Sequence, residues 1–302
     1  MKILIIGSSG RLGAALMREY RDKFDLTGFD HQALDLGDAR RVRDKIGPLD
    51  VDLVINCAAL TNVDHCETHR DEAFQVNAEA PRVLAEICRD KNAKLIHFST
   101  DYVFDGEKCD PYTEEDRTKP ISVYGESKLQ GERNVLAAQD RHLVVRVSWV
   151  FGPDRPSFID AIIKRARESE HVDAIADKFA APTYTFDIAK MLPGFFPWHR
   201  LPADVPGIIG NMPMPRILHF ANAGECSWQQ YGQWALECCR ESGVALKAQQ
   251  VAPLKLSDMK NFVARRPVYS VLSTAKYSEV TGVSPRSWRD AVADYVRDFV
   301  AR

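Results

Sequence analysis

The hydrophobic positions of this chain fall into two patterns that follow one another in turn. Short continuous apolar runs, such as KILII at residues 2–6, predict strands buried on both faces, as in a parallel sheet. Apolar residues three and four positions apart, such as Val83 and Ile87, predict amphipathic helices. The strands predicted in this way are residues 2–6, 25–29, 52–60, 95–98, 142–152 and 217–222. The predicted helices include residues 14–21, 73–90, 124–138, 157–168, 187–196, 228–239 and 288–299.

Strands that alternate with helices predict a doubly wound α/β fold of the Rossmann type, a parallel sheet with helices on both faces. In such a sheet, ligands bind outside the carboxyl ends of the strands. The residues at these ends that could take part in ligand binding or catalysis are Gly10, Asn56, Thr100, Tyr124 and Trp149. This convergence, more than any single motif, predicts a ligand site at that edge.

A glycine-rich loop joins the first predicted strand to the first predicted helix. Gly7, Gly10 and Gly13 have the spacing G-x-x-G-x-x-G. Glycines allow a tight turn and a close approach of the backbone, and a helix N-terminus offers free N–H donors to a pyrophosphate. Asp30 ends the second strand about twenty residues later, where an acid can hold an adenosine ribose. We therefore predict a dinucleotide-binding site.

A second constellation lies between residues 95 and 128. One strand ends in Ser99-Thr100-Asp101, and a helix begins near Tyr124 and carries Lys128 one turn later. Residues four apart share a helix face, so the phenol and the ammonium should point the same way. We expect the cation to lower the pKa of the phenol from about 10 toward neutrality, and Thr100 to add a hydroxyl. Tyr-x-x-x-Lys alone also fits an ordinary amphipathic helix.

The character of the sequence changes past Gly152, and we predict two domains. Residues 1–150 form the dinucleotide-binding domain, and residues 151–302 mainly a smaller C-terminal α/β substrate domain, parts of which cross back to the first. Residues 61–67 and 177–183 are predicted loops, and residues 197–216 a Pro-rich excursion. Asn77 lies near a predicted core face. It either hydrogen-bonds backbone near the site or is a structural asparagine.

Composition excludes several classes of function. Lys and Arg number 40 and Asp and Glu 42, so the net charge of −2 offers no basic field for nucleic acid. The apolar runs are far shorter than the roughly 20 residues of a membrane span. A strand begins at once, so we expect no signal peptide. The 7 Cys include no C-x-x-C pair and predict reduced thiols in the cytoplasm. The His residues lack metal-ligand spacing, and we expect no metal.

Several motifs resemble the extended short-chain dehydrogenase/reductase superfamily, and more closely the dTDP-4-dehydrorhamnose reductase family. The matching segments cover most of the chain and are GSSGRLG (7–13), NCAALTNVDHCE (56–67), VNAEA (76–80), STDYVFDG (99–106), PISVYGESKLQGE (120–132), RVSWVFG (146–152) and ARRPVYSVL (264–272). The resemblance implies an enzyme that reduces a 4-keto nucleotide sugar with NADH or NADPH. The dTDP-linked substrate would be dTDP-4-dehydro-L-rhamnose, and a homodimer is left open.

The resemblance also implies roles for individual residues. Thr100, Tyr124 and Lys128 would form the catalytic set. The cofactor would contact Tyr124, Lys128 and also Gly7, Ser9, Gly10, Arg11, Leu12, Gly13, Asp30, Asp35, Leu36, Asn56, Cys57, Ala58, Ala59, Thr61 and Ser99. The substrate would contact Thr100, Asp101, Val103, Phe104, Trp149, Arg265 and Arg266. Guanidinium geometry suits a diphosphate, although surface arginines would have the same sequence.

Three departures from the family pattern lie near the expected substrate. Ser122 stands where Asn is usual two residues before the tyrosine, and Lys178 and Ala180 interrupt the usual D-Q-F-G-x-P-T. The segment 193–216 is longer than usual. These departures leave the hydride chemistry in place and put the particular sugar in doubt.

Two other functions remain open at this point. The family also resembles a non-catalytic regulatory subunit of methionine adenosyltransferase, although the intact Thr, Tyr and Lys favour an enzyme. A nucleotide-sugar epimerase or dehydratase is the other alternative, but Tyr102 follows Asp101 where dehydratases often have Glu. Asp30 favours NADH, while Arg11, His31, Arg40 or Arg41 could neutralise it, so we predict use of both cofactors with a lean toward NADH.

Overall fold

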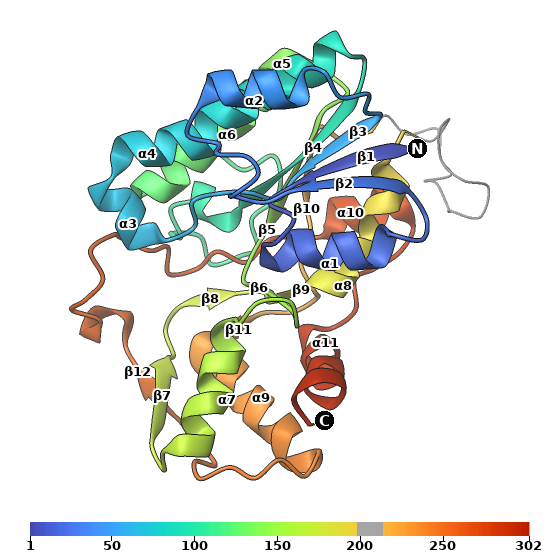
Figure 1. Ribbon diagram of the computed structural model, residues 1–302. Coiled ribbons are helices and arrows are strands. Elements are labelled where there is room, and N and C mark those ends of the chain that lie inside the picture. Colours follow the sequence, from blue (N-terminus) through green and yellow to red (C-terminus); the bar gives the residue numbers. More distant parts are fainter. Residues whose placement is uncertain (198–213, 302) are drawn as a thin grey trace.

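The computed structural model describes residues 1–197 and 214–301 and has two lobes (Figure 1). The larger lobe contains a six-stranded sheet in the order β10-β5-β4-β3-β1-β2, with every neighbouring pair parallel. The strands are β1 (Lys2–Ile6), β2 (Asp25–Phe29), β3 (Leu53–Asn56), β4 (Lys94–Thr100), β5 (Leu143–Val147) and β10 (Ile217–His219). This confirms the predicted parallel α/β sheet. The C-terminal half of the chain contributes β10 to it.

Helices cover both faces of this sheet (Figure 1). Helices α1 (Arg11–Tyr20), α8 (Thr185–Met191) and α10 (Ala275–Thr281) lie on one face, and α2 (Ala39–Ile46), α5 (Ala80–Asp90) and α6 (Val123–Ala138) on the other. Alternate residues of β1 feed the two cores: Ile3 and Ile5 pack in the first, and Leu4 and Ile6 in the second. Burial on both faces explains why β1 reads as a continuous apolar run.

The segment between β3 and α5 is more helical than the sequence predicted. The expected loop at residues 61–67 contains α3 (Val63–Thr68), and α4 (Arg70–Phe74) follows it. The Asn62 side chain accepts a hydrogen bond from the His65 backbone N–H at 3.0 Å and so caps α3. A π-helical turn (Gln75–Glu79) then leads directly into α5.

The smaller lobe is built around α7 (Phe158–Glu168), α9 (Trp228–Glu241) and α11 (Trp288–Tyr295), which a π-helical turn (Val296–Val300) extends. Strands β7 (Val172–Ile175) and β12 (Val251–Leu254) pair in parallel beside these helices. Short strands form the junction between the lobes: β6 (Val150–Phe151), β8 (Phe179–Ala180), β9 (Thr183–Tyr184) and β11 (Cys226–Ser227). The expected loop at 177–183 is therefore partly strand, because β8 pairs with β11 and β9 with β6.

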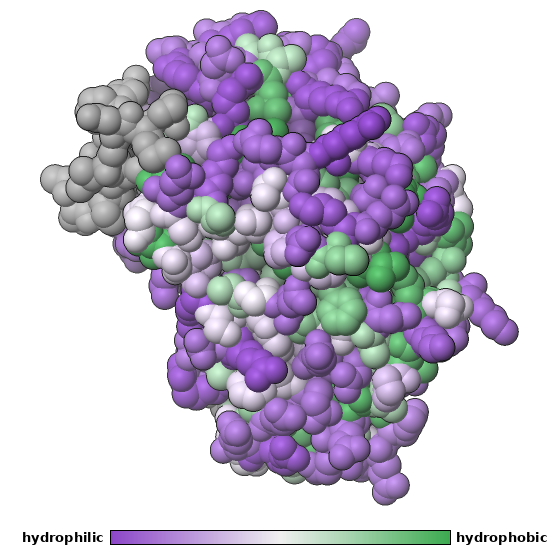
Figure 2. Space-filling model, turned by 180° about the vertical axis from the view of Figure 1, so that it is seen from behind, coloured by the Kyte–Doolittle hydropathy of each residue, from purple (hydrophilic) through white to green (hydrophobic). Residues whose placement is uncertain are grey.

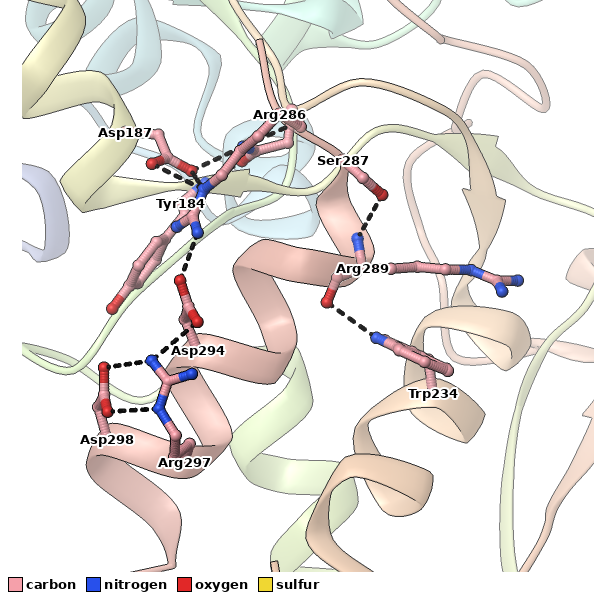
Figure 3. Close-up of polar contacts among 10 residues, drawn as sticks. Tyr184, Asp187, Trp234, Arg286, Ser287, Arg289, Asp294, Arg297 and Asp298 are labelled. Atoms are coloured by element: carbon pink, nitrogen blue, oxygen red, sulfur yellow. Dashed lines mark hydrogen bonds and ion pairs between the residues drawn. The ribbon is translucent and has the colours of Figure 1, made fainter. Parts of the chain in front are cut away.

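An ionic cluster joins the two lobes (Figure 3). Arg286 lies just before α11 and binds Asp187 of α8 at 2.9 Å and also Asp294 of α11. Asp187 additionally accepts a hydrogen bond from Asn222 at 2.7 Å. Ser287 caps α11 by accepting from the Arg289 N–H. Helix α8, which packs on α1, is thus tied to the last helix.

Two sequence expectations concern the remaining surface. Most of the Pro-rich excursion predicted at 197–216, together with much of the long segment 193–216, lies outside the described residues. Hydrophilic side chains cover most of the face in Figure 2, with hydrophobic residues in small groups among them. None of the helices in the described part of the chain is long and apolar enough to cross a membrane.

Candidate active site

The carboxyl ends of the central strands bring the predicted residues to one edge of the sheet. Ile6 at the end of β1 lies opposite Asn56 at the end of β3, and Thr100 at the end of β4 lies opposite Val147 of β5. The chain passes from β1 to β2 on one side of β1 and then to β3 on the other. This reversal of strand order is the place where doubly wound sheets bind their ligands.

The glycine loop at this reversal has the geometry of a phosphate cradle. Gly7 has φ +78°, and a Cβ there would lie 2.9 Å from the Ala58 nitrogen. A Cβ at Gly13 would lie 2.1 Å from the Gly7 carbonyl oxygen. Gly10 occupies the N-cap of α1 without any capping side chain. The loop therefore leaves the start of α1 open to an anion, and the half-buried Cys57, Ala58 and Ala59 form a flat neighbouring surface. These residues fit a dinucleotide.

Arg11 does not have the role suggested from its sequence position. Its guanidinium donates to the Arg155 carbonyl at 3.3 Å and to the Pro156 carbonyl, while Arg155 donates to the Ser9 carbonyl at 2.8 Å. Arg11 thus joins the glycine loop to the segment after β6. The structure corrects the idea that it neutralises Asp30, because these contacts hold it against the second lobe.

The residues predicted to bind the cofactor beyond β2 differ in the solvent exposure of their side chains. Asp30 is half-buried and accepts a hydrogen bond from the Ala33 N–H at 2.9 Å. Asp35 is exposed and accepts from the Gly37 N–H at 2.9 Å. The Leu36 side chain packs in the core beside α2. Any contact of Leu36 with a cofactor would therefore involve its backbone.

Thr100, Tyr124 and Lys128 come together as predicted. Thr100 ends β4, and Tyr124 and Lys128 lie one turn apart at the start of α6. Ser122 is the N-cap of α6 and accepts a hydrogen bond from the Gly125 N–H at 3.2 Å. The departure at residue 122 therefore preserves a capping side chain. The Tyr124 ring packs edge-on against Tyr102, with 5.5 Å between ring centroids.

The expected pKa of Tyr124 is wrong for the protein without a ligand. Burial raises the pKa of the phenol above its ordinary value, while a hydrogen bond with Thr100 acts in the opposite direction. Lys128 donates to the Phe98 carbonyl at 2.7 Å, and burial lowers its own pKa to about 8. Desolvation outweighs the attraction expected between phenol and ammonium. Tyr124 is thus a protonated phenol at neutral pH, which suits a proton donor.

Two buried polar residues, His97 and Asn77, make hydrogen bonds beside the site. His97, which the sequence reasoning missed, is fully buried, and burial lowers its pKa. Its ring nitrogens lie 3.1 Å from the Asn56 amide nitrogen and 3.5 Å from the Lys128 amine. Asn77 of the π-helical turn accepts from the Leu60 N–H at 2.8 Å and donates to the Leu60 carbonyl at 3.0 Å and to Ser127 at 3.1 Å. Asn77 therefore hydrogen-bonds backbone beside the site, the first of its two predicted roles.

Asp101 follows Thr100 directly, and only 2% of it is exposed. Its carboxylate accepts hydrogen bonds from Thr100 at 3.0 Å, Ser148 at 2.9 Å and Ser270 at 2.6 Å. Lys178 is a nearby cation, itself fully buried. The two serines were missed, and only the departure from the family pattern marked Lys178. Protein groups cover the Asp101 carboxylate in this state, and its direct contact with substrate stays a prediction.

Val103 and Phe104 also differ from their predicted role. Both have no exposed surface and pack with Tyr112, Leu129 and Leu272 in an apolar cluster. Their side chains therefore support the loop after β4 and do not line a ligand site. The local sequence cannot show this burial, because Leu129 and Leu272 come from other parts of the chain.

Trp149, by contrast, has a conformation that calls for an explanation. Its φ is +42°, which is rare for a bulky side chain, and its indole nitrogen is buried without a hydrogen-bond partner among the residues that the structure describes. The ring packs against Trp228, with 5.7 Å between centroids, and lies 5.8 Å from the Lys178 amine. Backbone strain of this kind concentrates at ligand sites.

A cavity of about 370 Å³ opens beside the loop after β4. Its lining combines apolar side chains with two arginines: Asp105, Gly106, Glu107, Ile121, Leu256, Met259, Phe262, Ala264, Arg265, Arg266 and Val268. The structure separates the two arginines by role. Arg266 forms a bidentate pair with Asp64 of α3, at 2.6 and 3.1 Å, and stacks on Phe262. Arg265 is exposed, and among the described residues it has no recorded hydrogen bond or ion pair.

A doubly wound sheet with a glycine cradle and a buried tyrosine and lysine on one edge defines a nicotinamide-dinucleotide-dependent oxidoreductase of the short-chain type. The family model described as RmlD substrate binding domain matches residues 1–301. The chain belongs to this family, and the resemblance seen in the sequence is confirmed.

Individual proteins that are similar to the chain carry names of the same kind. The chain is 32% identical to a dTDP-4-dehydrorhamnose reductase of Burkholderia thailandensis, with 100% of both chains covered. It is 34% identical to a probable dTDP-4,6-dihydroxy-2-methyloxan-3-one 4-ketoreductase of Streptomyces antibioticus, covering 100% of this chain and 96% of the other. A crystal structure of the dTDP-4-dehydrorhamnose reductase of Bacillus anthracis in complex with NADP is similar, with TM-score 0.85, 28% identity and coverage of 97% and 98%.

Proposed function

We propose that this protein reduces the 4-keto group of a dTDP-deoxysugar, with dTDP-4-dehydro-L-rhamnose as substrate and dTDP-L-rhamnose as product. The observation that carries this proposal is the meeting of Thr100, Tyr124 and Lys128 at the edge where β1 and β3 form the dinucleotide cradle. The names of the relatives support a nucleotide-linked ketosugar. They also favour an enzyme over a non-catalytic regulatory subunit.

The chain's own residues would divide the chemistry as follows. The bound dinucleotide supplies a hydride to the ketone carbon. Tyr124 gives its proton to the developing alkoxide, a contribution of roughly 10²–10⁴ in rate. Thr100, which shares a hydrogen bond with Tyr124, orients the phenol. The Lys128 ammonium holds the cofactor ribose. Because the Phe98 carbonyl fixes this amine at 2.7 Å, its position exists before the cofactor arrives.

The nucleotide diphosphate would bind in the cavity beside the loop after β4. Arg265 is the candidate for the phosphates, because Asp64 already occupies the guanidinium of Arg266. The apolar lining from Leu256, Met259 and Phe262 suits a base. Trp149 would cover the sugar. Remote contacts of this kind raise the rate only when they position the ketone.

The test is oxidation of the reduced cofactor with dTDP-4-dehydro-L-rhamnose, followed by determination of the product configuration at C4. Wild-type protein should form dTDP-L-rhamnose, and the free sugar should be a very poor substrate. Tyr124→Phe should lower kcat by at least about a hundredfold without a large change in dinucleotide affinity. Wild-type turnover by Tyr124→Phe would remove the proton-donor role.

A second candidate substrate is another dTDP-linked 4-ketosugar, as the name of the Streptomyces relative indicates. Lys178 and Ala180 depart from the family pattern beside the expected sugar site, and they favour testing such substrates in parallel. A product with the opposite C4 configuration would keep the reductase and replace the sugar. Tight dinucleotide binding without turnover of any ketosugar would instead support the regulatory-subunit alternative.

A further inference from the structure

Lys178 is a buried cation beside the catalytic residues. It has no exposed surface, and its amine donates one hydrogen bond, of 2.8 Å, to the Pro267 carbonyl. The amine also lies 5.1 Å from the centre of the Tyr102 ring and 5.8 Å from that of Trp149. Aromatic faces and a single carbonyl replace only part of the water that an ammonium loses on burial. A nearby negative charge must offset the rest.

Asp101 is that negative charge. It attracts Lys178 through space, without a hydrogen bond between the two in the described structure. Three hydroxyls also donate to it, with Thr100 on Oδ1 and Ser148 and Ser270 both on Oδ2. Burial by itself would favour a neutral carboxyl, and the cation opposes this. The two residues therefore form a buried charge pair directly behind the catalytic threonine.

The charge of Asp101 determines what the Thr100 hydroxyl can do, because that hydroxyl has one proton. An ionised carboxylate only accepts, so Thr100 donates to it at 3.0 Å while its oxygen accepts from the Tyr102 N–H at 3.2 Å. Tyr124 interacts with the same hydroxyl, and its phenolate would compete for the same proton. Whenever Tyr124 gives up its proton, the Asp101 carboxylate and the Tyr124 phenolate therefore compete for the one proton of the Thr100 hydroxyl.

We propose that Lys178 is a positioning residue for the reduction, which offsets the charge of Asp101 so that Thr100 can turn its hydroxyl to the Tyr124 oxygen as the phenol loses its proton. Ser148 and Ser270 keep the Asp101 carboxylate hydrogen-bonded when the Thr100 hydroxyl turns away from it. Without the cation, the ionised Asp101 carboxylate holds the Thr100 proton more firmly. This withdraws the donor that Tyr124 needs. This inference rests on the proposed roles of Thr100 and Tyr124.

The experiment compares Lys178→Met and Lys178→Gln, which remove the charge, with Lys178→Arg, which keeps it. Because Lys178 is fully buried, we expect the neutral variants to lower kcat at least tenfold while KM for the dTDP-ketosugar changes less than threefold. Lys178→Arg should recover much of the loss. A variant series in which KM rises and kcat stays constant would overturn the proposal, since it would make Lys178 a substrate contact.

The pH profile separates this role from simple support of the fold. Removal of the cation should raise the pKa of Asp101, and a protonated carboxyl no longer competes for the Thr100 proton. The kcat deficit of the neutral variants relative to wild type should therefore shrink as the pH falls. Tyr102 and Tyr124 also face this pair, but burial raises the pKa of both phenols, so neither changes charge on the acid side of neutrality; the Arg266 guanidinium faces Lys178 as well. A kcat deficit that does not change with pH in a folded, impaired variant would contradict the proposal.

A double-mutant cycle with Thr100→Val completes the test. If Lys178 acts through Thr100, Lys178→Gln should cost little further activity when the threonine hydroxyl is already absent. Equal losses in both backgrounds would overturn the proposal. Should Lys178→Met fail to fold, Lys178→Gln and Lys178→Arg give the same comparison. Failure of the wild type with every ketosugar would overturn the proposed function and this inference together, whereas an active wild type with unaffected variants would overturn this inference alone.

Discussion

At the scale of single residues, burial decides the protonation states of the site more than the neighbouring charges do. The same desolvation raises the pKa of Tyr124 and lowers that of Lys128 to about 8. Both shifts favour the neutral form of the group. Tyr124 is thereby kept as a proton donor, while Lys128 is cationic at neutral pH but close to the end of its charged range.

This places a pH limit on dinucleotide binding. Lys128 is protonated below about pH 8 and loses its charge above it, so the dissociation constant should rise with pH above that value, by up to about tenfold per unit. Titration of the reduced cofactor by fluorescence between pH 6.5 and 9.5, a range of roughly one and a half units on each side, measures this. Lys128→Met should abolish the pH dependence.

Lys94→Met is the matched control. Burial also lowers the pKa of Lys94 to about 8, but Lys94 begins β4 and so lies at the opposite edge of the sheet. An equal effect of both variants would contradict the role of Lys128.

We expect a single side chain, that of Asp30, to decide the choice of cofactor. The Asp30 carboxylate should accept the 2′-hydroxyl of NADH and repel the 2′-phosphate of NADPH, and Arg11 is occupied elsewhere. Asp30→Ala should therefore raise the kcat/KM ratio of NADPH over NADH by about tenfold or more, which steady-state kinetics with both cofactors measures. Asp25→Ala, at the opposite end of β2, should leave the ratio unchanged. A strong NADPH preference of the wild type would contradict the ribose role of Asp30.

At the scale of elements, short contacts between distant segments hold the catalytic edge in place. Helix α8 packs on α1 in one lobe, and Arg286 ties it to α11 in the other (Figure 3). Asp187 is largely buried, with 10% of its side chain exposed, and satisfies both Arg286 and Asn222. Loss of the guanidinium would leave this carboxylate partly unpaired.

We therefore expect Arg286→Ala to lower the free energy of unfolding by about 1–3 kcal/mol, as for other hydrogen bonds to charged groups. Urea unfolding followed by circular dichroism measures the change. Arg297→Ala is the matched control, because Arg297 binds Asp294 and Asp298 on an exposed surface and should contribute little. Equal effects of the two substitutions would show that the connection between α8 and α11 is not specifically stabilising.

At the scale of the whole molecule, the cavity proposed for the substrate is assembled from segments that are far apart in the sequence. Asp105–Glu107 follow β4, whereas residues 256–268 come from the last sixth of the chain. A Cβ at Gly106 would lie 2.7 Å from Pro267, so these two segments approach as closely as backbone allows. The proposed diphosphate site thus depends on how the two halves of the chain fold onto one another.

Arg265→Ala should raise KM for the dTDP-ketosugar by about 10- to 100-fold, because charge-assisted hydrogen bonds contribute roughly 1.5–3 kcal/mol. The kcat value should change much less, since Arg265 is remote from the ketone. Lys260→Ala removes an equal charge from an exposed position of the same segment and should leave KM unaltered. Matching effects of both variants would indicate general electrostatic attraction, and an unchanged KM in Arg265→Ala would remove the diphosphate contact.

The sequence alone determined the parallel sheet, the main helices that cover it and the edge at which Thr100, Tyr124 and Lys128 meet. Each of these depends on local patterns: β1 is apolar because both of its faces are covered, and Tyr124 and Lys128 share a helix face because they are four residues apart. Parallel strands then bring Gly7, Asn56 and Thr100 together without further information. Such features are predictable because they follow from periodicity and from the direction of the strands.

Only the tertiary structure decided which residues face a ligand and which are covered. Val103 and Phe104 belong to the STDYVFDG motif (99–106), yet Tyr112 and Leu272 cover them from outside that motif. Arg265 and Arg266 are neighbours, but Asp64, about two hundred residues earlier, engages only one of them. The pairing of Asp101 with Lys178 likewise joins distant positions. Long-range contacts set burial, and burial sets exposure and charge, so no local pattern contains this information.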